Sequence, residues 1–192
     1  MLTKEEIREA LVERHSEEVQ SKLDEAKVAI AGLGGLGSNI AFFLTRIGVG
    51  HLHLIDFDRV DITNLNRQQY RMEHIGRYKT EALCVRVTDE NVGTLFHNED
   101  IICEAFDCPE AKAMLVSGVG EYYPDKILVA GSGMAGYGRS NEIVTRKINE
   151  HFYLCGDAHT EPVKGRGLMA PRVAICAAHQ ANLITELIIR GK

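Results

Sequence analysis

Hydrophobic and polar positions along the chain alternate between strand-like runs and helical spacing, in the order typical of an α/β protein. Four short apolar runs predict buried strands, at residues 27–31, 51–56, 100–105 and 126–130. Segments with apolar residues three or four positions apart predict helices, at residues 35–47 and from Ile75, Pro109 and Pro171 onward. Because strands that alternate with helices build parallel sheets, we expect a Rossmann-like, mainly parallel sheet with helices on both faces.

The first residues of the chain predict a helical arm. Thr3 and Glu6 have the spacing of a capping box, which favours an amphipathic helix with Ile7 on its apolar stripe. A short helical piece around Leu23 follows. Residues 1–25 are therefore expected to form an N-terminal helical arm.

The last third of the chain predicts strands of a different kind. Residues 143–147 and 152–154 are β-rich, and their short connection indicates antiparallel strands added to the parallel sheet near its C-terminal side. Residues 131–138 are too rich in glycine for regular structure and predict a loop that forms part of a site. Residues 156–168 predict a polar, flexible crossover segment.

A glycine-rich turn within residues 28–37 carries the strongest functional signal, because an apolar strand runs directly into it and a helix follows. Gly32 permits the tight turn, Gly34 lets the backbone approach a phosphate, and Gly37 allows the helix to pack closely on the strand. The first N–H groups of the helix then point at an anion. Asp56 ends the next strand about 20 residues further on, where it would grip a ribose hydroxyl. We therefore expect a nucleotide to bind here.

Charged residues around this turn favour ATP over NAD. The carboxyl ends of parallel strands meet at one edge of the sheet, which brings Asp56, Asp107 and the 131–138 loop together. Arg67 and Lys79 at a nucleotide's phosphates would stabilise charge that develops in phosphoryl or nucleotidyl transfer, and an acid beside them can hold Mg²⁺. An NAD site needs only the glycines and Asp56, because hydride transfer requires neither cations nor a metal. Taken singly, Asp107 is also compatible with simple capping of the helix that Pro109 opens.

Composition narrows the class of protein. The chain has 192 residues, of which 45% are apolar, enough for one core but too few for a separate substrate domain, so we expect a single domain over residues 1–192. Its net charge is −5 and its cations are dispersed, which argues against nucleic acid or an anionic membrane as a partner. No apolar run approaches the ~18 residues of a membrane span, and the charged start favours a cytoplasmic protein.

The combined motifs resemble the adenylation domain of the ubiquitin-activating-enzyme superfamily, and within it the small ThiF-type sulfur-carrier adenylyltransferases of the ThiF/MoeB/HesA group. The motifs that carry the resemblance are Gly32-x-Gly34-Gly35-x-Gly37, Asp56-Phe57-Asp58, Asn64-x-x-Arg67-Gln68, Lys79, Asp107 and the segments 132–137 and 167–172. The resemblance implies ATP and Mg²⁺ as cofactors. It also implies a partner, a small ubiquitin-fold sulfur carrier with a Gly-Gly C-terminus, whose terminal carboxylate is adenylylated, with thiamine (thiazole) biosynthesis as the expected pathway.

The resemblance also assigns a role to each matching residue. It implies a nucleotide-binding set of Gly32, Gly34, Gly35, Gly37, Asp56, Asp58, Asn64 and Gln68. Within it Asp56 binds the ATP ribose, while Arg67 and Lys79 contact the triphosphate.

The resemblance further implies a metal ligand and a homodimer. Asp107 is expected to coordinate Mg²⁺. An N-terminal arginine of one subunit is expected to reach the ATP of the other. Arg14 is the best match for that arginine, with Arg8 as the alternative.

The chain departs from the family pattern at its cysteines. It has five of them and no C-x-x-C pair, so structural zinc is not expected. Cys155 is interpreted as a packing residue rather than a sulfur-handling thiol. His151, Cys155 and His159 are too scattered to predict a metal site and are better interpreted as surface histidines beside a buried thiol.

A second departure concerns the region between Lys79 and Asp107, which is shorter than in relatives by roughly fifteen residues. Either the sheet lacks a strand there or residues 84–88 replace one. This leaves two further hypotheses beside adenylylation, namely a non-catalytic module for nucleotide binding and carrier docking, and an NAD-dependent oxidoreductase.

Overall fold

The computed structural model describes residues 3–80 and 91–191 of the chain. Its six-stranded sheet has the order β2-β1-β3-β4-β6-β5. The strands are β1 (Lys27–Ala31), β2 (His51–Ile55), β3 (Ile101–Glu104), β4 (Ile127–Gly131), β5 (Val144–Lys147) and β6 (Phe152–Gly156). Neighbouring strands run parallel except β5, which runs antiparallel to β6. The structure thus confirms the mainly parallel, Rossmann-like sheet and the antiparallel addition near its C-terminal side.

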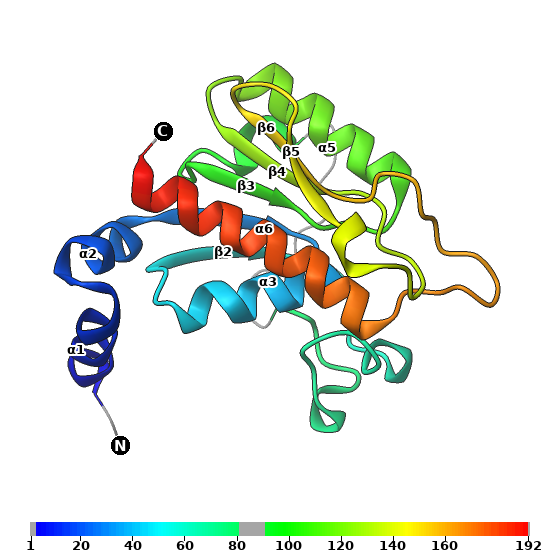
Figure 1. The fold of residues 1–192 in the computed structure, drawn as a ribbon, viewed down its shortest axis with the longest axis horizontal. Coiled ribbons are helices and arrows are strands. Elements are labelled where there is room, and N and C mark those ends of the chain that lie inside the picture. Colours follow the sequence, from blue (N-terminus) through cyan, green and yellow to red (C-terminus); the bar gives the residue numbers. More distant parts are fainter. Residues whose placement is uncertain (1–2, 81–90, 192) are drawn as a thin grey trace.

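Helices cover both faces of this sheet, as predicted. Figure 1 shows α3 and α6 side by side on one face, with α5 on the other. The helices are α1 (Lys4–His15), α2 (Glu17–Glu25), α3 (Gly35–Arg46), α4 (Val92–Leu95), α5 (Pro109–Tyr122) and α6 (Ala170–Arg190), with short 3₁₀ turns η1 (Ile62–Asn64), η2 (Met72–His74) and η3 (Ser140–Glu142). Within residues 3–80 and 91–191, no helix is long and apolar enough to cross a membrane.

Strand β1 shows why its sequence is apolar at successive positions. Val28 and Ile30 pack into the cluster under α3 and α6, whereas Ala29 and Ala31 pack into the cluster under α4 and α5. Successive side chains of a strand point to opposite faces, and both faces here are covered. The sequence therefore reads as a continuous apolar run instead of alternating with polar residues.

The N-terminal arm begins as predicted but packs loosely. The Thr3 hydroxyl accepts the Glu6 N–H, and the Glu6 carboxylate accepts the Thr3 N–H, so the capping box is confirmed. Helix α1 buries none of its residues, and Ile7 on the predicted apolar stripe is 50% exposed. The Arg8 guanidinium ties α1 to α2 through its ion pair with Asp24, at 2.7 Å.

The prediction of a helix beginning near Ile75 is wrong for the described residues. Ile75 instead ends the η2 turn, and Gly76 follows with a φ of +83°, a conformation that interrupts a right-handed helix. The backbone after Gly76 then pairs with an earlier segment, since the N–H of Val60 donates to the carbonyl of Arg77 at 2.9 Å. Residues 84–88, proposed as a replacement strand, lie outside the described part of the chain.

Candidate active site

A cavity of about 810 Å³ opens at the carboxyl ends of the parallel strands. It lies beside β1, which has β2 on one side and β3 on the other, so the sheet order reverses there. Open α/β sheets bind ligands at such a switch point, and this volume is ordinary for a small-molecule site. Every predicted site residue except Gly37 and Arg14 lines it, namely Gly32, Gly34, Gly35, Asp56, Asp58, Asn64, Arg67, Gln68, Lys79 and Asp107.

The glycine turn between β1 and α3 has no room for side chains at two positions. Gly32 has a φ of +93°, and a Cβ atom there would lie 2.9 Å from the carbonyl oxygen of Ala105. A Cβ atom on Gly37 would lie only 1.8 Å from the carbonyl oxygen of Gly32. Gly37 therefore acts by close packing behind the turn and does not line the cavity. No side chain caps the start of α3, which leaves its first N–H groups for a ligand or solvent.

Asp56 fastens the glycine turn to the end of β2. One carboxylate oxygen accepts the N–H of Leu33 at 2.7 Å, and the other accepts the N–H of Asp58 at 2.8 Å. The ammonium group of Lys79 lies 3.0 Å from the Asp58 carboxylate and 3.7 Å from that of Asp56. Asp56 is 7% exposed. Its part in positioning the loop is a role that the sequence motif did not suggest.

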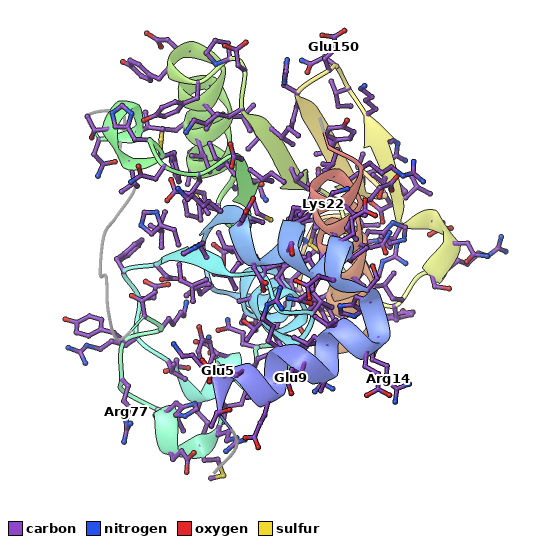
Figure 2. All side chains as sticks on the ribbon, turned by 90° about the vertical axis from the view of Figure 1, so that its left-hand side faces the viewer. Glu5, Glu9, Arg14, Lys22, Arg77 and Glu150 are labelled. Atoms are coloured by element: carbon purple, nitrogen blue, oxygen red, sulfur yellow. The ribbon has the colours of Figure 1, made fainter. Side chains whose placement is uncertain are left out.

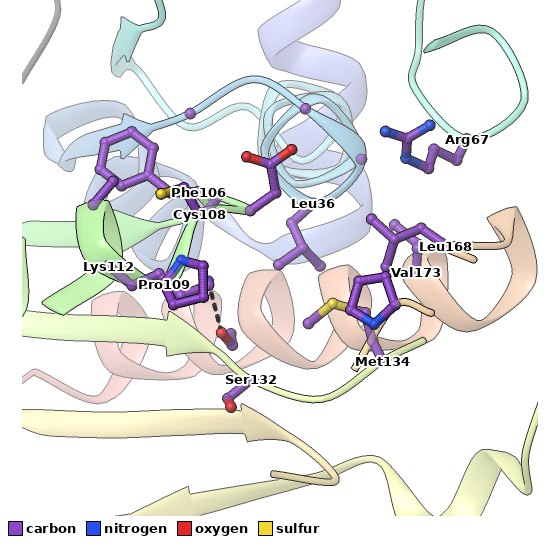
Figure 3. Close-up of a pocket in the computed structure, with 18 of the residues that line it drawn as sticks. Leu36, Arg67, Phe106, Cys108, Pro109, Lys112, Ser132, Met134, Leu168 and Val173 are labelled. Atoms are coloured by element: carbon purple, nitrogen blue, oxygen red, sulfur yellow. Dashed lines mark hydrogen bonds between the residues drawn. The ribbon is translucent and has the colours of Figure 1, made fainter. Parts of the chain in front are cut away.

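Arg67 and Gln68 bring unsatisfied polar atoms to the cavity. Arg67 packs over Gly35, where an added Cβ atom would meet its side chain at 3.4 Å. Its Nε and the Gln68 Oε1 are buried without a hydrogen-bond partner in the part of the chain that the structure describes. Buried polar atoms usually have partners, so these two atoms fit a polar ligand in the cavity. Figure 3 shows Arg67 and Phe106 on opposite sides of this space.

Asp107 follows β3 and is exposed at the wall of the cavity. The capping interpretation for this residue fails, because Cys108 is the N-cap residue of α5 and makes no side-chain capping bond. Across residues 3–80 and 91–191, no group of three or more His, Cys, Asp or Glu side chains could hold a metal ion. Asp107 is thus one of several carboxylates that line the cavity, together with Asp56, Asp58 and Glu110.

An ion pair between Lys112, which lines the cavity, and the buried Glu104 was missed by the sequence analysis. The Lys112 ammonium donates to both carboxylate oxygens of Glu104, at 3.0 and 2.9 Å, and to the carbonyl of Gly131 at 2.9 Å. Burial raises the pKa of Glu104, although Lys112 opposes this shift. The sequence did offer a signal for this pair, because Glu104 ends β3 and Lys112 lies in the first turn of α5. The pair joins the ends of β3 and β4, and Figure 3 places Lys112 beside Pro109.

The opposite wall of the cavity comes from the last third of the chain. Residues 131–135 and 158–162 line it, together with Leu168 and Val173. The glycine-rich loop predicted to form part of a site therefore does line the cavity. The crossover segment contains one buried polar residue, Asp157, which is 5% exposed. Its flexibility remains a prediction.

Neither candidate arginine of the N-terminal arm reaches the cavity of its own subunit. Arg14 is exposed near the end of α1, on the outer surface of the arm (Figure 2). Arg8 is paired with Glu17 at 2.6 Å and with Asp24. Arg8 is therefore engaged within its own chain, and the contact of Arg14 with a second subunit stays a prediction.

The described cysteines divide into one exposed residue, Cys108, and three buried residues, Cys103, Cys155 and Cys176. Burial raises the pKa of the Cys155 thiol, which lowers the fraction of reactive thiolate. This agrees with the interpretation of Cys155 as a packing residue.

Several relatives of the chain are named as adenylyltransferases. The molybdopterin-synthase adenylyltransferase of Salmonella typhimurium is 27% identical over 194 residues, which cover 89% of this chain and 76% of that protein. The sulfur carrier protein adenylyltransferase of Thermus thermophilus is 32% identical over 126 residues, which cover 55% of this chain and 46% of that protein. Several eukaryotic relatives are much longer, and the chain spans between 18% and 29% of their length.

Among solved structures, the E. coli tRNA N6-threonylcarbamoyladenosine dehydratase in complex with AMP superimposes with a TM-score of 0.85. The match covers 99% of this chain and 98% of that chain at 18% sequence identity. At this identity the match establishes the fold alone. Residues 7–89 match the ThiF family. This match confirms the resemblance that the motifs predict.

Proposed function

We propose that the chain is an ATP-dependent adenylyltransferase that acts on the C-terminal glycine carboxylate of a small ubiquitin-fold sulfur carrier protein. The observation that carries the proposal is the cavity in which an uncapped helix start, the unsatisfied Arg67 and Gln68 atoms and the Asp107 carboxylate meet. Relatives named as adenylyltransferases for molybdopterin synthase and for a sulfur carrier support the same reaction class.

The nucleotide lies along the glycine turn in this proposal. The phosphates face the first N–H groups of α3 and the Arg67 guanidinium. The ribose lies toward Asp56, where Lys79 supplies a positive charge beside the phosphates. Mg²⁺ is commonly held by one or two carboxylates plus substrate phosphates. Asp107 fits that need, and the ion would neutralise charge on the phosphates.

The reaction requires alignment more than proton transfer. A carboxylate oxygen of the carrier attacks the α-phosphorus of ATP. A new O–P bond forms while the bond from the α-phosphorus to the bridging oxygen breaks, and pyrophosphate leaves. No side-chain base is needed, because a glycine carboxylate is already ionised at neutral pH. Arg67 and Lys79 then contribute by stabilising the charge that develops on the phosphates.

The carrier tail occupies the second half of the cavity. Residues 131–135 and 158–162 wall this half, and glycine and alanine are frequent among them. Small residues leave room for an extended peptide backbone to reach the α-phosphate. The tail enters beneath the crossover segment, residues 156–168.

The proposal also includes the subunit arrangement and the pathway. Arg14 of one subunit reaches the ATP of the other in a homodimer, in the cytoplasm. The carrier is the one of thiamine (thiazole) biosynthesis. Because related carriers share similar tails, the docking surface of the carrier decides the pathway, and the test must include carriers from more than one pathway.

ATP–pyrophosphate exchange with Mg²⁺ tests the function. Carriers of the thiamine and molybdopterin type are each compared with the same carrier lacking its terminal glycine. Exchange that depends on that glycine is the expected result. ATP binding without exchange for any carrier would favour the docking-module alternative, and NAD binding that ignores R67A would favour an oxidoreductase.

A further inference from the structure

A buried ion pair stands behind the second wall of the cavity. Arg172, in the first turn of α6, lies 2.6 Å from the carboxylate of Asp157, which follows β6 directly. Their side chains are 3% and 1% exposed. Neither residue lines the cavity. Any effect of this pair on a ligand must therefore pass through the residues that it holds.

Asp157 organises the turn that follows it. One carboxylate oxygen accepts the N–H groups of His159 and Thr160, at 2.9 and 2.8 Å. The other accepts the Thr160 hydroxyl at 2.7 Å, beside the Arg172 guanidinium. The Thr160 hydroxyl oxygen in turn accepts the N–H of Ala135 at 3.1 Å. A single carboxylate thus connects the 158–162 wall to the 131–135 wall.

Backbone contacts bring the same two walls close together. The N–H of Asp157 donates to the carbonyl of Gly133 at 2.9 Å, and that of Ala158 donates to the carbonyl of Ser132 at 3.0 Å. A Cβ atom on Gly133 would lie 2.1 Å from the Asp157 carboxylate. Ala158 has a φ of +65°, which is unusual for a residue with a side chain. Such a conformation persists where surrounding bonds over-determine it.

Arg172 anchors this assembly to the rest of the fold. Its Nη1 donates to the carbonyl of Arg139 at 2.8 Å, and its Nη2 lies 3.5 Å from the Glu142 carboxylate. It therefore joins α6 and η3 to the turn after β6. The nucleotide half of the cavity uses none of these contacts, because its turn is fastened by Asp56.

We infer that Asp157 and Arg172 are positioning residues for the second substrate, which fix the two walls between which the carboxylate-bearing peptide tail lies. The inference rests on the proposed function for the identity of that substrate. Among the residues that line the cavity, the pair holds those of the 131–135 and 158–162 walls, so its effect should fall on the tail and not on the nucleotide.

D157N tests this inference with little change in shape. The amide nitrogen cannot accept the hydrogen bonds that the carboxylate oxygen accepts, and the buried Arg172 guanidinium loses its nearest counter-charge and keeps only Glu142, at 3.5 Å. We expect the KM for the carrier in pyrophosphate exchange to rise about tenfold or more, while the ATP Kd stays within about twofold. R172K keeps the charge but loses the forked geometry of the guanidinium, so its carrier KM should lie between those of D157N and the native protein.

E99Q is the matched control. Glu99 is also buried, at 8% exposure, and its carboxylate lies 2.9 Å from His53, near the start of β3 and away from the cavity. E99Q should lower stability and leave the carrier KM unchanged. An equal rise of the carrier KM in E99Q and D157N would show a general effect of instability and overturn the inference.

Hydrogen exchange separates this inference from the proposed function, because it needs no turnover. The amides of Ala135, His159 and Thr160 should lose protection in D157N but not in E99Q. If the native protein binds no carrier, the proposed function is wrong. The positioning role of Asp157 and Arg172 is then tested by hydrogen exchange alone. Unchanged protection of these amides in D157N overturns the inference in every case.

Discussion

The two walls of the cavity are held in place by different forces. The nucleotide wall, formed by the glycine turn and the end of β2, depends on close packing at Gly32 and Gly37, where backbone atoms lie too near for any side chain, in addition to the hydrogen bonds of Asp56. The opposite wall is fixed by charge, because a single buried carboxylate, Asp157, gathers Arg172 and Thr160. Packing depends little on pH, whereas a buried carboxylate depends on its ionisation. The two walls should therefore fail under different perturbations.

Substitution of Gly37 should give the largest effect, because it removes the packing of the nucleotide wall. A methyl group in G37A would overlap the Gly32 carbonyl, so the turn must move. We expect a loss of about 3 kcal/mol or more in unfolding free energy and the loss of ATP binding. Chemical denaturation and ATP titration measure these changes.

G120A is the control for this substitution. Gly120 also lies in a helix, but a Cβ atom there meets nothing within 4 Å. We expect the unfolding free energy of G120A to rise by about 0.5–1 kcal/mol, because alanine favours the helix more than glycine does. Retained ATP binding in G37A would contradict the packing role of that glycine.

R67A should give the next largest effect, confined to catalysis at the nucleotide wall. Loss of a charged donor near the reacting phosphate typically lowers kcat by about 10² to 10³. Stability should change little, because the hydrogen bonds that the Arg67 guanidinium makes, to the Thr63 carbonyl and the Asn66 side chain, are exposed to solvent. R46A is a control, since Arg46 stacks on Phe42 away from the cavity. Equal loss of exchange in both variants would refute a specific role for Arg67.

Acid should weaken the wall that Asp157 holds. Burial alone would raise the pKa of Asp157, but hydrogen bonds from Thr160, His159 and Arg172 hold that pKa well below its usual range. Because the folded pKa lies below the unfolded value of about 3.9, the stabilisation is fully present above about pH 4. It is lost as the pH falls further toward the folded pKa.

The measurement is the unfolding free energy between about pH 2 and pH 7 for the native protein and D157N. The native curve should fall more steeply in acid, so the difference between the two proteins should shrink as the pH decreases. Glu104 has a raised pKa and contributes with the opposite sign, so only this difference is diagnostic. A constant difference across the range would show that the Asp157 charge does not hold the wall.

The two walls also differ in how far the sequence predicts them. The strand β1, the glycine turn and Asp56 lie within a short stretch, and each has local chemistry that indicates its place. The sequence therefore located the residues of the nucleotide wall, although it did not show that Asp56 fastens the turn. Gly37 was predicted to pack the helix closely, and its lack of space for a side chain agrees with that role.

The residues behind the second wall have no local signature. Asp157 and Arg172 are separated by most of the crossover segment, and their pairing depends on how α6 returns across the sheet. The Glu104 and Lys112 pair is nearer in sequence, but its burial follows from the position of α5. The predicted helix from Ile75 failed for a related reason, because Gly76 and a long-range backbone pairing outweighed the apolar spacing.

The smallest predicted effect tests how tightly the charge-held wall imposes its backbone. Ala158 adopts a φ of +65°, which costs an alanine about 1 kcal/mol relative to glycine. Glycine also has more freedom to lose on folding, at about 0.4–1 kcal/mol. The unfolding free energy of A158G should therefore be unchanged or higher by up to about 1 kcal/mol.

A178G is the matched control, and it should lower stability. Ala178 is exposed in the interior of α6, where glycine costs about 1 kcal/mol. The unfolding free energies of the two variants, measured by thermal and chemical denaturation, should therefore change in opposite directions or differ by about 1 kcal/mol. Equal destabilisation by A158G and A178G would mean that Ala158 has an ordinary backbone conformation in solution. The Asp157 carboxylate would then not be holding the turn in the strained form that shapes the second wall.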